Sequence, residues 1–600
     1  MPYERRGAYA AIRDYAAIGD GRTVALVARD GAIDWLCLPN LDSPSTFGAL
    51  LDAERGGSFV LRPATPFDSE RRYVPKTNVL ETTFTTATGA VRVTDALTLP
   101  GHGLSPYREL VRRIESLAGQ VAMEWSVEPR FGYAAAPARR EQRAGVPVST
   151  HGRDAVAVCF WDAGTARWNG EAIASSFTAT DGESSLVVLS AAHQEPLVLP
   201  SRAEAEERLT ATARTWRQWV EGRDYDGAWR DAVLRSALAL KLLVFAPSGA
   251  IAAAATTSLP EAIGGERNWD YRYSWPRDAA FTLEALLALG CSREARAFFW
   301  WLLHASQLTH PRFQVLYRLD GGVDTEERSL PLAGYRDSRP VRVGNGASTQ
   351  TQLDVYGEVL QAVARFADFG GGLDRDHGRR AAAIADFVCE NWMRPDAGIW
   401  EVRGEPKHYT QSKMMCAVAL ESVCALHDQG VLRGDAERWR RELASIREFV
   451  ETRCWSERTK SYVRTADEED LDASLLLAVV AGYDEPQSER LRATVDAVAR
   501  TLREGPFVRR YRSDDGLRGD EGAFLTCSFW LVDAYARQGR LEDAAELMDG
   551  LVGLANDVGL YAEEIDPASG EFLGNFPQAL THLALINAAV SFACAQEARG

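Results

Sequence analysis

The chain has 600 residues, of which 46 % are apolar and 25 % are charged, and its formal net charge is −17. That length exceeds what one hydrophobic core usually organises, so we expect two domains, one of them large. The acidic surplus disfavours nucleic acid and anionic membranes as partners, because phosphate binding needs an excess of Lys and Arg. A small neutral ligand is compatible with this charge.

The N-terminal stretch MPYERRGAYAAIRDYAAIGDG has no apolar run typical of a signal peptide. No run of about 18 apolar residues exists that would span a membrane. The nine cysteines are scattered, and no CxxC pair indicates a zinc or redox site. We therefore expect a cytoplasmic protein without metal or cofactor, and a homo-oligomer is compatible with the sequence.

Residues 1–205 are expected to form an antiparallel β-sandwich. Runs such as TVALVARDGAIDWLCLP and SSLVVLSAA combine β-branched residues with Gly, Asp or Pro at their ends. These runs follow one another without intervening helices, which favours antiparallel pairing. Residues 206–223 change to a helical period with charged residues on one side, which predicts a helical linker.

Residues 224–600 are predicted to be helical. Links after even-numbered helices are short, whereas links after odd-numbered helices are long and rich in Trp, Arg, Glu and Gly. In an up-and-down barrel the long links all emerge at one end, so the pattern predicts a barrel with one functional face. The alternative is an irregular helical domain without ring closure. The twelve predicted helices lie near residues 226–245, 277–289, 293–307, 352–368, 377–393, 412–427, 434–453, 470–481, 488–503, 522–538, 541–555 and 577–597.

The first long link ends in RNWDYRYSWPRD, directly before a predicted helix. Trp269, Tyr271 and Trp275 offer flat apolar surfaces for stacking on a sugar ring. The pair Arg277 and Asp278 offers donors beside acceptors, which suits vicinal hydroxyls. The alternative is that these residues cap and anchor the following helix, but the density of the cluster favours a binding site.

Two later links each carry a candidate catalytic carboxyl group. Glu401 follows Trp400, and a carboxyl group packed against an indole is poorly solvated, which raises its pKa and suits a general acid. Glu563 lies in the last long link, which the alternation places on the same barrel face. Two carboxyl groups across a groove are the minimum for glycoside hydrolysis. The alternative at either position is a solvated glutamate in a turn.

Two arginines in other long links are further candidates for substrate binding. Arg342 lies in LPLAGYRDSRPVRVGNGA, where a structural role fits equally well, and Arg512 lies in YRSDDGLRGDEGAF. Other chemistries lack their motifs, since the sequence has no GxGxxG after a strand, no P-loop, no HExxH and no GxSxG.

At these residues the chain resembles glycoside hydrolase family 15, the glucoamylase and trehalase-like family. The runs RNWDYRYSWPRDAAFTLEALL and LANDVGLYAEEIDPASGEFLGNFPQALTHLALINAA carry the resemblance in residues 224–600. The run IGDGRTVALVARDGAIDWLCLPNLDSPSTFGALLD resembles the trehalase-like N-terminal domain of bacterial members. The resemblance implies an N-terminal β-sandwich followed by a catalytic all-α (α/α)6 barrel.

The same resemblance implies roles for individual residues. Matching motifs make Glu401 the general acid and Glu563 the general base of a single inverting displacement. The terminal glucose would be held by Trp275, Arg277 and Asp278, with Tyr271 beneath the anomeric centre. Arg512 is a weaker match, because loop lengths differ there within the family.

The sequence thus predicts an inverting, exo-acting α-glucoside hydrolase that releases glucose from the non-reducing end of a soluble oligo- or disaccharide. The alternative is an α,α-trehalase of the same family. A glycoside phosphorylase, in which phosphate replaces the base, and a non-catalytic carbohydrate-binding protein are rivals that do not need both Glu401 and Glu563. Substrates with α-1,4, α-1,6 and α,α-1,1 linkages all fit the sequence.

Overall fold

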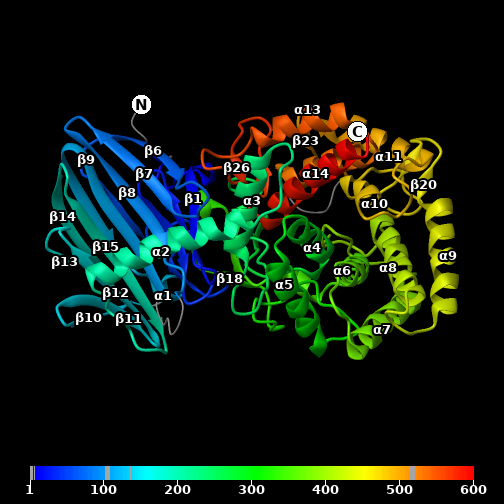
Figure 1. Ribbon diagram of the computed structural model, residues 1–600, viewed down its shortest axis with the longest axis horizontal. Helices are drawn as coiled ribbons and strands as arrows, with labels where there is room; N and C mark the ends of the chain where they lie inside the picture. Colours follow the sequence, from blue (N-terminus) through cyan, green and yellow to red (C-terminus); the bar gives the residue numbers. More distant parts are fainter. Residues whose placement is uncertain (1–4, 6, 102–107, 136, 514–520, 600) are drawn as a thin grey trace.

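The computed structural model describes residues 5, 7–101, 108–135, 137–513 and 521–599. An antiparallel sheet part occupies the N-terminal third and a helical part occupies the rest (Figure 1). Helix α2 (Arg202–Glu221) lies between them and begins with a capping box, in which Ser201 and Glu204 accept each other's backbone N–H. The expected order of an antiparallel β domain and a helical domain is confirmed.

The N-terminal strands are hydrogen-bonded into one sheet of fifteen strands through the 20-residue strand β9 (Arg108–Val127). The first part of β9 pairs with β8 and β15, and its last residues pair with β5 and β14. The strands are therefore continuous across β9 rather than divided into two unconnected sheets. The other strands are β1 (Tyr15–Gly19), β2 (Val24–Ala28), β3 (Ala32–Cys37), β4 (Ser45–Phe47), β5 (Phe59–Pro63), β6 (Phe67–Tyr73), β7 (Leu80–Thr86), β8 (Gly89–Leu97), β10 (Arg139–Arg143), β11 (Val146–His151), β12 (Asp154–Trp161), β13 (Arg167–Asn169), β14 (Ala172–Thr180) and β15 (Ser184–His193). A four-residue helix, α1 (Phe131–Ala134), follows β9.

The helical part contains a helix close to each of the predicted positions. The eighth differs, because a 3-10 turn (Ala473–Leu476) precedes a single turn of α-helix, α10 (Leu477–Val480). The others are α3 (Arg230–Leu243), α4 (Ala279–Ala288), α5 (Ser292–Ala305), α6 (Asp354–Asp368), α7 (Arg375–Asn391), α8 (Thr410–Asp428), α9 (Ala436–Arg453), α11 (Glu489–Leu502), α12 (Leu525–Arg537), α13 (Leu541–Val552) and α14 (Ala579–Glu597).

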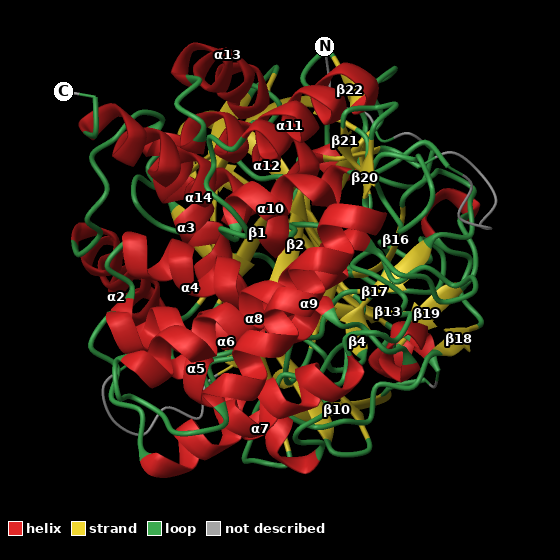
Figure 2. Ribbon diagram, turned by 90° about the vertical axis from the view of Figure 1, so that its right-hand side faces the viewer, coloured by secondary structure: helices red, strands yellow, loops and turns green. Residues whose placement is uncertain are grey.

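Every second helix is an inner helix. Helices α4, α6, α8, α10, α12 and α14 contact one another in that order, and α14 also contacts α4, so the series returns to its start. Outer helices such as α9 bury one side, which in α9 includes Trp439, Ile446 and Phe449, whereas α3 is buried on most of its surface. Figure 2 shows this helical part from the side facing away from the sheet.

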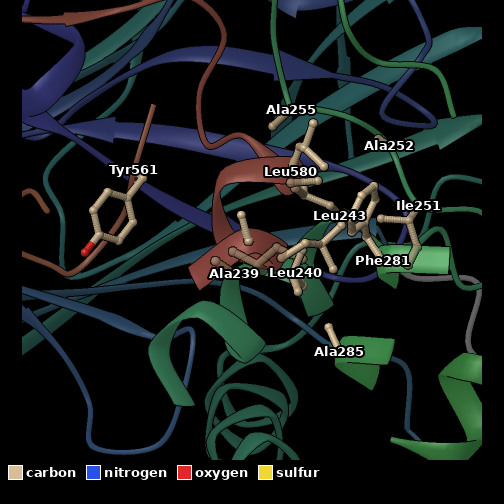
Figure 3. Close-up of a cluster of buried hydrophobic side chains, with 14 of the residues drawn as sticks. Ala239, Leu240, Leu243, Ile251, Ala252, Ala255, Phe281, Ala285, Tyr561 and Leu580 are labelled. Carbon is tan, nitrogen blue, oxygen red and sulfur yellow. The ribbon is translucent and has the colours of Figure 1, made fainter. Parts of the chain in front are cut away.

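Helix α14 is long and apolar enough, by length and composition, to cross a membrane, but 67 % of its apolar window is buried inside the protein. It contacts α3, α4 and α12. Figure 3 shows Leu580 of α14 in one apolar cluster with Phe281 of α4 and Leu243 of α3. Its composition is therefore accounted for by its place in the core.

Most long connections carry strands of short two- or three-stranded sheets, and the one between α7 and α8 has instead an isolated bridge between Asp396 and Lys407, while the connections between α4 and α5, α6 and α7, α8 and α9, and α12 and α13 are brief turns. The backbone of the long connections is therefore ordered by its own hydrogen bonds. Their strands are β16 (Thr257–Pro260), β17 (Asn268–Asp270), β18 (Arg328–Leu330), β19 (Val341–Val343), β20 (Trp455–Ser456), β21 (Ser461–Tyr462), β22 (Arg503–Glu504), β23 (Phe507–Val508), β24 (Ala523–Phe524), β25 (Glu564–Ile565) and β26 (Phe572–Leu573).

Candidate active site

An open cavity lies among the long connections, and its empty space of about 930 Å³ includes part of the open solvent. Five of these connections line it, together with the first turns of α12 and α14. Of the residues predicted from the sequence, it brings together Tyr271, Trp275, Arg277, Asp278, Trp400, Glu401 and Glu563.

Glu401 projects into the cavity from a tight turn. Its backbone is left-handed, with φ 58°, and its N–H donates to the carbonyl of Gly398 at 3.2 Å. Its Oε1 accepts hydrogen bonds from Trp275 Nε1 at 2.7 Å and from Arg277 Nη1 at 3.2 Å. The left-handed turn and the two donors together fix the direction of the carboxyl group, and Oε2 is the oxygen that these two donors leave free.

The indole that forms a hydrogen bond with the Glu401 carboxyl group belongs to Trp275. The expectation that the Trp400 indole packs there is wrong. The Trp400 indole instead donates to both carboxylate oxygens of Asp472, each at 2.9 Å. Trp400 still lines the cavity, where its ring lies 5.9 Å from that of Trp530.

Glu563 is 1 % exposed and lies at the start of β25. Its Oε2 accepts the backbone N–H of Asn575 at 3.1 Å, and among the described residues its Oε1 has no hydrogen-bond partner. Gly574 has a φ of 68°, and a Cβ at this position would lie 2.4 Å from Glu563 Oε2. The absence of a side chain at Gly574 leaves room for Oε2, which the Asn575 N–H holds. Oε1 is available to a ligand.

Burial raises the pKa of both carboxyl groups. For Glu401 the positive charge of Arg277 and the Trp275 hydrogen bond oppose the increase. For Glu563 the negative charge of Glu261 adds to the effect of burial, Arg510 opposes it, and the pKa is raised to about 8. Burial alone therefore does not divide the pair into a protonated acid and an ionised base.

Three carboxyl groups behind Glu563 converge on one arginine. Nη2 of Arg510 lies 2.6 Å from Glu521, 2.8 Å from Glu564 and 3.2 Å from Glu261. One oxygen from each of these glutamates lies within 4.8 Å of the others, a spacing that a metal ion could use. The guanidinium group supplies the positive charge of the cluster here, and Arg267 adds a second contact to Glu521 at 3.3 Å.

The two predicted arginines do not line the cavity. Arg342 lies behind its wall, where Nη1 donates to the carbonyls of Glu266 and Asn268. Arg512 follows β23 in the chain, its side chain is about half exposed, and its Nη2 contacts Glu504 of β22 at 2.7 Å. Arg510, two residues earlier, lines the cavity instead of Arg512. The carboxylate partners of Arg510 are buried beside the cavity, whereas the partner of Arg512 lies at the surface.

Several lining residues were not anticipated from the sequence. They sit singly in loops, where no periodic pattern marks them, and only their place in long connections pointed to them. These residues include Glu261, Arg267, Asn345, Arg403, Arg510, Tyr511 and Gln578.

The sheet domain supports a loop that lines the cavity, although none of the sheet-domain residues that the structure describes lines it. Arg272, next to Tyr271, is fully buried, pairs with Asp270 at 2.7 Å and donates from Nη1 to the carbonyl of Ser43 at 2.8 Å. Trp35 Nε1 donates to the carbonyl of Ala255 at 2.8 Å. The loop that carries Tyr271 and Trp275 therefore rests on the N-terminal part.

Comparisons with known proteins agree with this architecture. The model of glycosyl hydrolases family 15 matches residues 227–590, and that of the trehalase-like N-terminal domain matches residues 6–203. A crystal structure of a bacterial glucoamylase complexed with acarbose aligns with a TM-score of 0.70, 12 % identity, and coverage of 98 % of this chain and 96 % of that one. At that identity, the similarity concerns the fold alone.

Curated relatives match over nearly their full length. The trehalase of Mycolicibacterium smegmatis is 39 % identical over 637 residues, which cover 99 % of this chain and 92 % of that protein. The trehalase of Mycobacterium tuberculosis is 38 % identical and that of Thermoplasma volcanium 35 % identical. These two matches cover 99 % and 97 % of this chain, and 91 % and 93 % of the relatives.

Proposed function

The chain belongs to glycosyl hydrolase family 15, and from this membership we propose that it is an α,α-trehalase, which hydrolyses trehalose to two molecules of glucose. It is a glycoside hydrolase. The full-length similarity to proteins named trehalase favours trehalose over the glucoamylase-type oligosaccharides that were the first expectation. The resemblance to a glucoamylase supports only the fold.

We propose that the twelve helical segments form an (α/α)6 barrel and that the two parts of β9 belong to the two layers of a β-sandwich. The closed contact series of inner helices supports the barrel, as do the long connections that meet at one cavity. The separate partners of the two parts of β9 support the sandwich.

The observation that carries the proposal is the meeting of Glu401 and Glu563 in one cavity. In the proposed single displacement Glu401 donates a proton to the glycosidic oxygen, so that the second glucose leaves as an alcohol. Glu563 Oε1 takes a proton from the water that attacks the anomeric carbon. Inversion requires room for that water between the base and the sugar.

The stereochemistry of this reaction is distinctive. The attacked glucosyl unit leaves as β-glucose, whereas the leaving unit keeps its configuration and appears as α-glucose. Proton NMR in the first minutes of turnover should therefore show equal amounts of the two anomers. Release of α-glucose alone would contradict inversion.

A substrate panel tests the proposal and its rivals. Trehalose, maltose, maltotriose, isomaltose and kojibiose are each incubated with and without phosphate, and the products are separated. Trehalose should be turned over fastest, with free glucose as product. Preference for maltotriose would favour the glucoamylase-type activity, glucose 1-phosphate formed only with phosphate would favour a phosphorylase, and binding without turnover would favour a carbohydrate-binding protein.

We also propose a cytoplasmic location and a small neutral α-glucoside as the ligand. All nine cysteines are free thiols and eight of them are buried, which fits a reducing compartment. The net charge of −17 fits a neutral ligand better than nucleic acid or an anionic membrane.

A further inference from the structure

Trp269 contacts the supports of both candidate catalytic carboxyl groups. On the side of Glu563, its carbonyl accepts from Asn575 Nδ2 at 2.9 Å, and the backbone N–H of Asn575 donates to Glu563 at 3.1 Å. Its indole Nε1 donates to Glu261 at 2.9 Å, and the charge of Glu261 acts on Glu563. Trp269 thus holds both a backbone support and a charged neighbour of the base.

On the side of Glu401, the ring of Trp269 carries a guanidinium group of the same turn. The Cζ atom of Arg403 lies 4.1 Å from the ring centroid, and Arg403 also contacts Glu327 at 3.0 Å. Glu327 contacts Arg342 as well, and the Cζ of Arg342 lies 4.5 Å from the same ring. An arginine over an indole ring is attracted by the negative face of the ring.

We propose that Trp269 is a positioning residue that fixes the general-acid turn and the general-base wall relative to one another. The proposal rests on the function proposed above. The two carboxyl groups come from connections far apart in the sequence, so their relative placement depends on contacts between those connections. Trp269 belongs to a third connection and touches both.

The consequence is mechanistic rather than merely structural. Misplacement of reacting groups by about 1 Å can lower a rate by about 10²-fold, even where the fold is intact. Loss of the ring should free the Arg403 side of the turn and weaken protonation of the leaving group. Loss of the indole N–H alone should act on Glu261 and, through it, on the base.

Two substitutions separate these effects. Trp269→Phe keeps an aromatic ring for the guanidinium groups but removes the donor to Glu261, whereas Trp269→Leu removes both. Activity is measured on α-glucosyl fluoride, which needs no proton from the acid, and on aryl α-glucosides of similar shape whose leaving groups differ in pKa.

In Trp269→Leu, kcat/KM on the aryl glucosides should fall more steeply than in wild type as the leaving-group pKa rises. The extra loss of kcat/KM should be tenfold or more for the poorest leaving group relative to the best. Arg403→Met should have the same effect. Trp269→Phe should leave that slope near wild type. It should move the pH midpoint for α-glucosyl fluoride downward, because Glu261 without its donor holds a proton more readily and repels the charged base less.

Trp455 provides a matched control. Its ring lies 4.6 Å from the Cζ of Arg490 and its indole donates to Glu457 at 3.0 Å, so the same set of contacts occurs away from the cavity. Trp455→Leu and Trp455→Phe should change neither the slope nor the pH midpoint. If the Trp269 variants raise KM alone, with slope and midpoint unchanged, Trp269 is only a wall residue and the proposal is wrong.

Hydrogen exchange tests the same inference without turnover. In Trp269→Leu, the amides of residues 398–403 and 572–576 should exchange faster than in wild type and in Trp455→Leu. Unchanged exchange in both segments would overturn the positioning role even in an active enzyme. Should wild type hydrolyse no glucoside, the proposed function fails, and the exchange experiment still decides whether Trp269 joins the two segments.

Discussion

Glu401 and Glu563 differ in the oxygens that they leave free, although burial raises the pKa of both. Oε1 of Glu401 is held by two donors, one of them a cation. Glu563 is held through Oε2 by one backbone N–H. An oxygen of each carboxyl group is therefore available for proton transfer, while the other fixes its direction.

The acid role of Glu401 predicts a loss that depends on the leaving group. Glu401→Gln keeps the shape of the side chain but has no proton to donate, so activity on trehalose should fall by at least about 10²–10⁴-fold. α-Glucosyl fluoride, whose leaving group needs no protonation, should keep most of its rate. Initial rates of the variant and wild type are measured on both substrates. Equal losses of rate on both would contradict the role of Glu401 as the general acid.

The base role of Glu563 predicts a pH dependence. In the Glu401→Gln enzyme acting on α-glucosyl fluoride only the base should titrate, and because it must be ionised, the rate should rise with pH through the pKa of Glu563. That midpoint should lie well above the usual range of a glutamate, as burial and Glu261 dictate.

Glu261→Gln, added to the same enzyme, removes the neighbouring charge and should lower the midpoint. A midpoint near 4, or one unmoved by Glu261→Gln, would contradict the electrostatic account of the base.

Among the elements, helices were easier to predict than strands. Buried residues recur every three or four positions in outer helices such as α11, where Leu491, Val495, Val498 and Leu502 face inward, so periodicity reveals them. Strands β6 and β10 are polar and largely exposed, so no apolar alternation marks them. The short α10 shows the reverse case, since an apolar run predicted a longer helix than the backbone forms.

The residues of the candidate site likewise differ in whether the sequence reveals them. Motif residues such as Trp275, Arg277, Glu401 and Glu563 could be chosen from the sequence because they stand in dense clusters or in loops of the right parity. Arg510 could not be distinguished from Arg512, because the choice depends on where the carboxylates of other connections lie in space.

The contact between α6 and α8 predicts that alanine substitutions at two helical glycines have opposite effects on stability. A Cβ on Gly357 of α6 would lie 2.4 Å from the carbonyl of Met415 in α8, whereas one on Gly550 of α13 would lie 3.7 Å from Pro506. Gly357→Ala should therefore destabilise the protein by about 1–3 kcal/mol through overpacking, despite the better helix propensity of alanine. Gly550→Ala should stabilise it by up to about 1 kcal/mol. Calorimetry should show Tm shifts of opposite sign, and shifts of the same sign would contradict the packing argument.

For the whole molecule, the buried Arg272 matters because it pairs with Asp270 within its own connection and also donates to the carbonyl of Ser43 in the N-terminal domain. Arg272→Met leaves the carboxylate of Asp270 buried without its partner, which should cost about 3–5 kcal/mol and lower the Tm. Arg62→Met, which breaks a half-exposed pair with Glu124, should change stability by less than about 1 kcal/mol. Equal effects would show that Arg272 is not an anchor.

The anchoring of Tyr271 and its neighbours on Ser43 and Ala255 has a consequence for how such enzymes diverge and are engineered. A change in the N-terminal sheet can be transmitted to the loop that carries Tyr271 and Trp275 through the contacts at Ser43 and Ala255. Chimeras that exchange the N-terminal domain between relatives would replace the residues on which this loop rests. The N-terminal domain and the loop must therefore come from sequences that are compatible with each other.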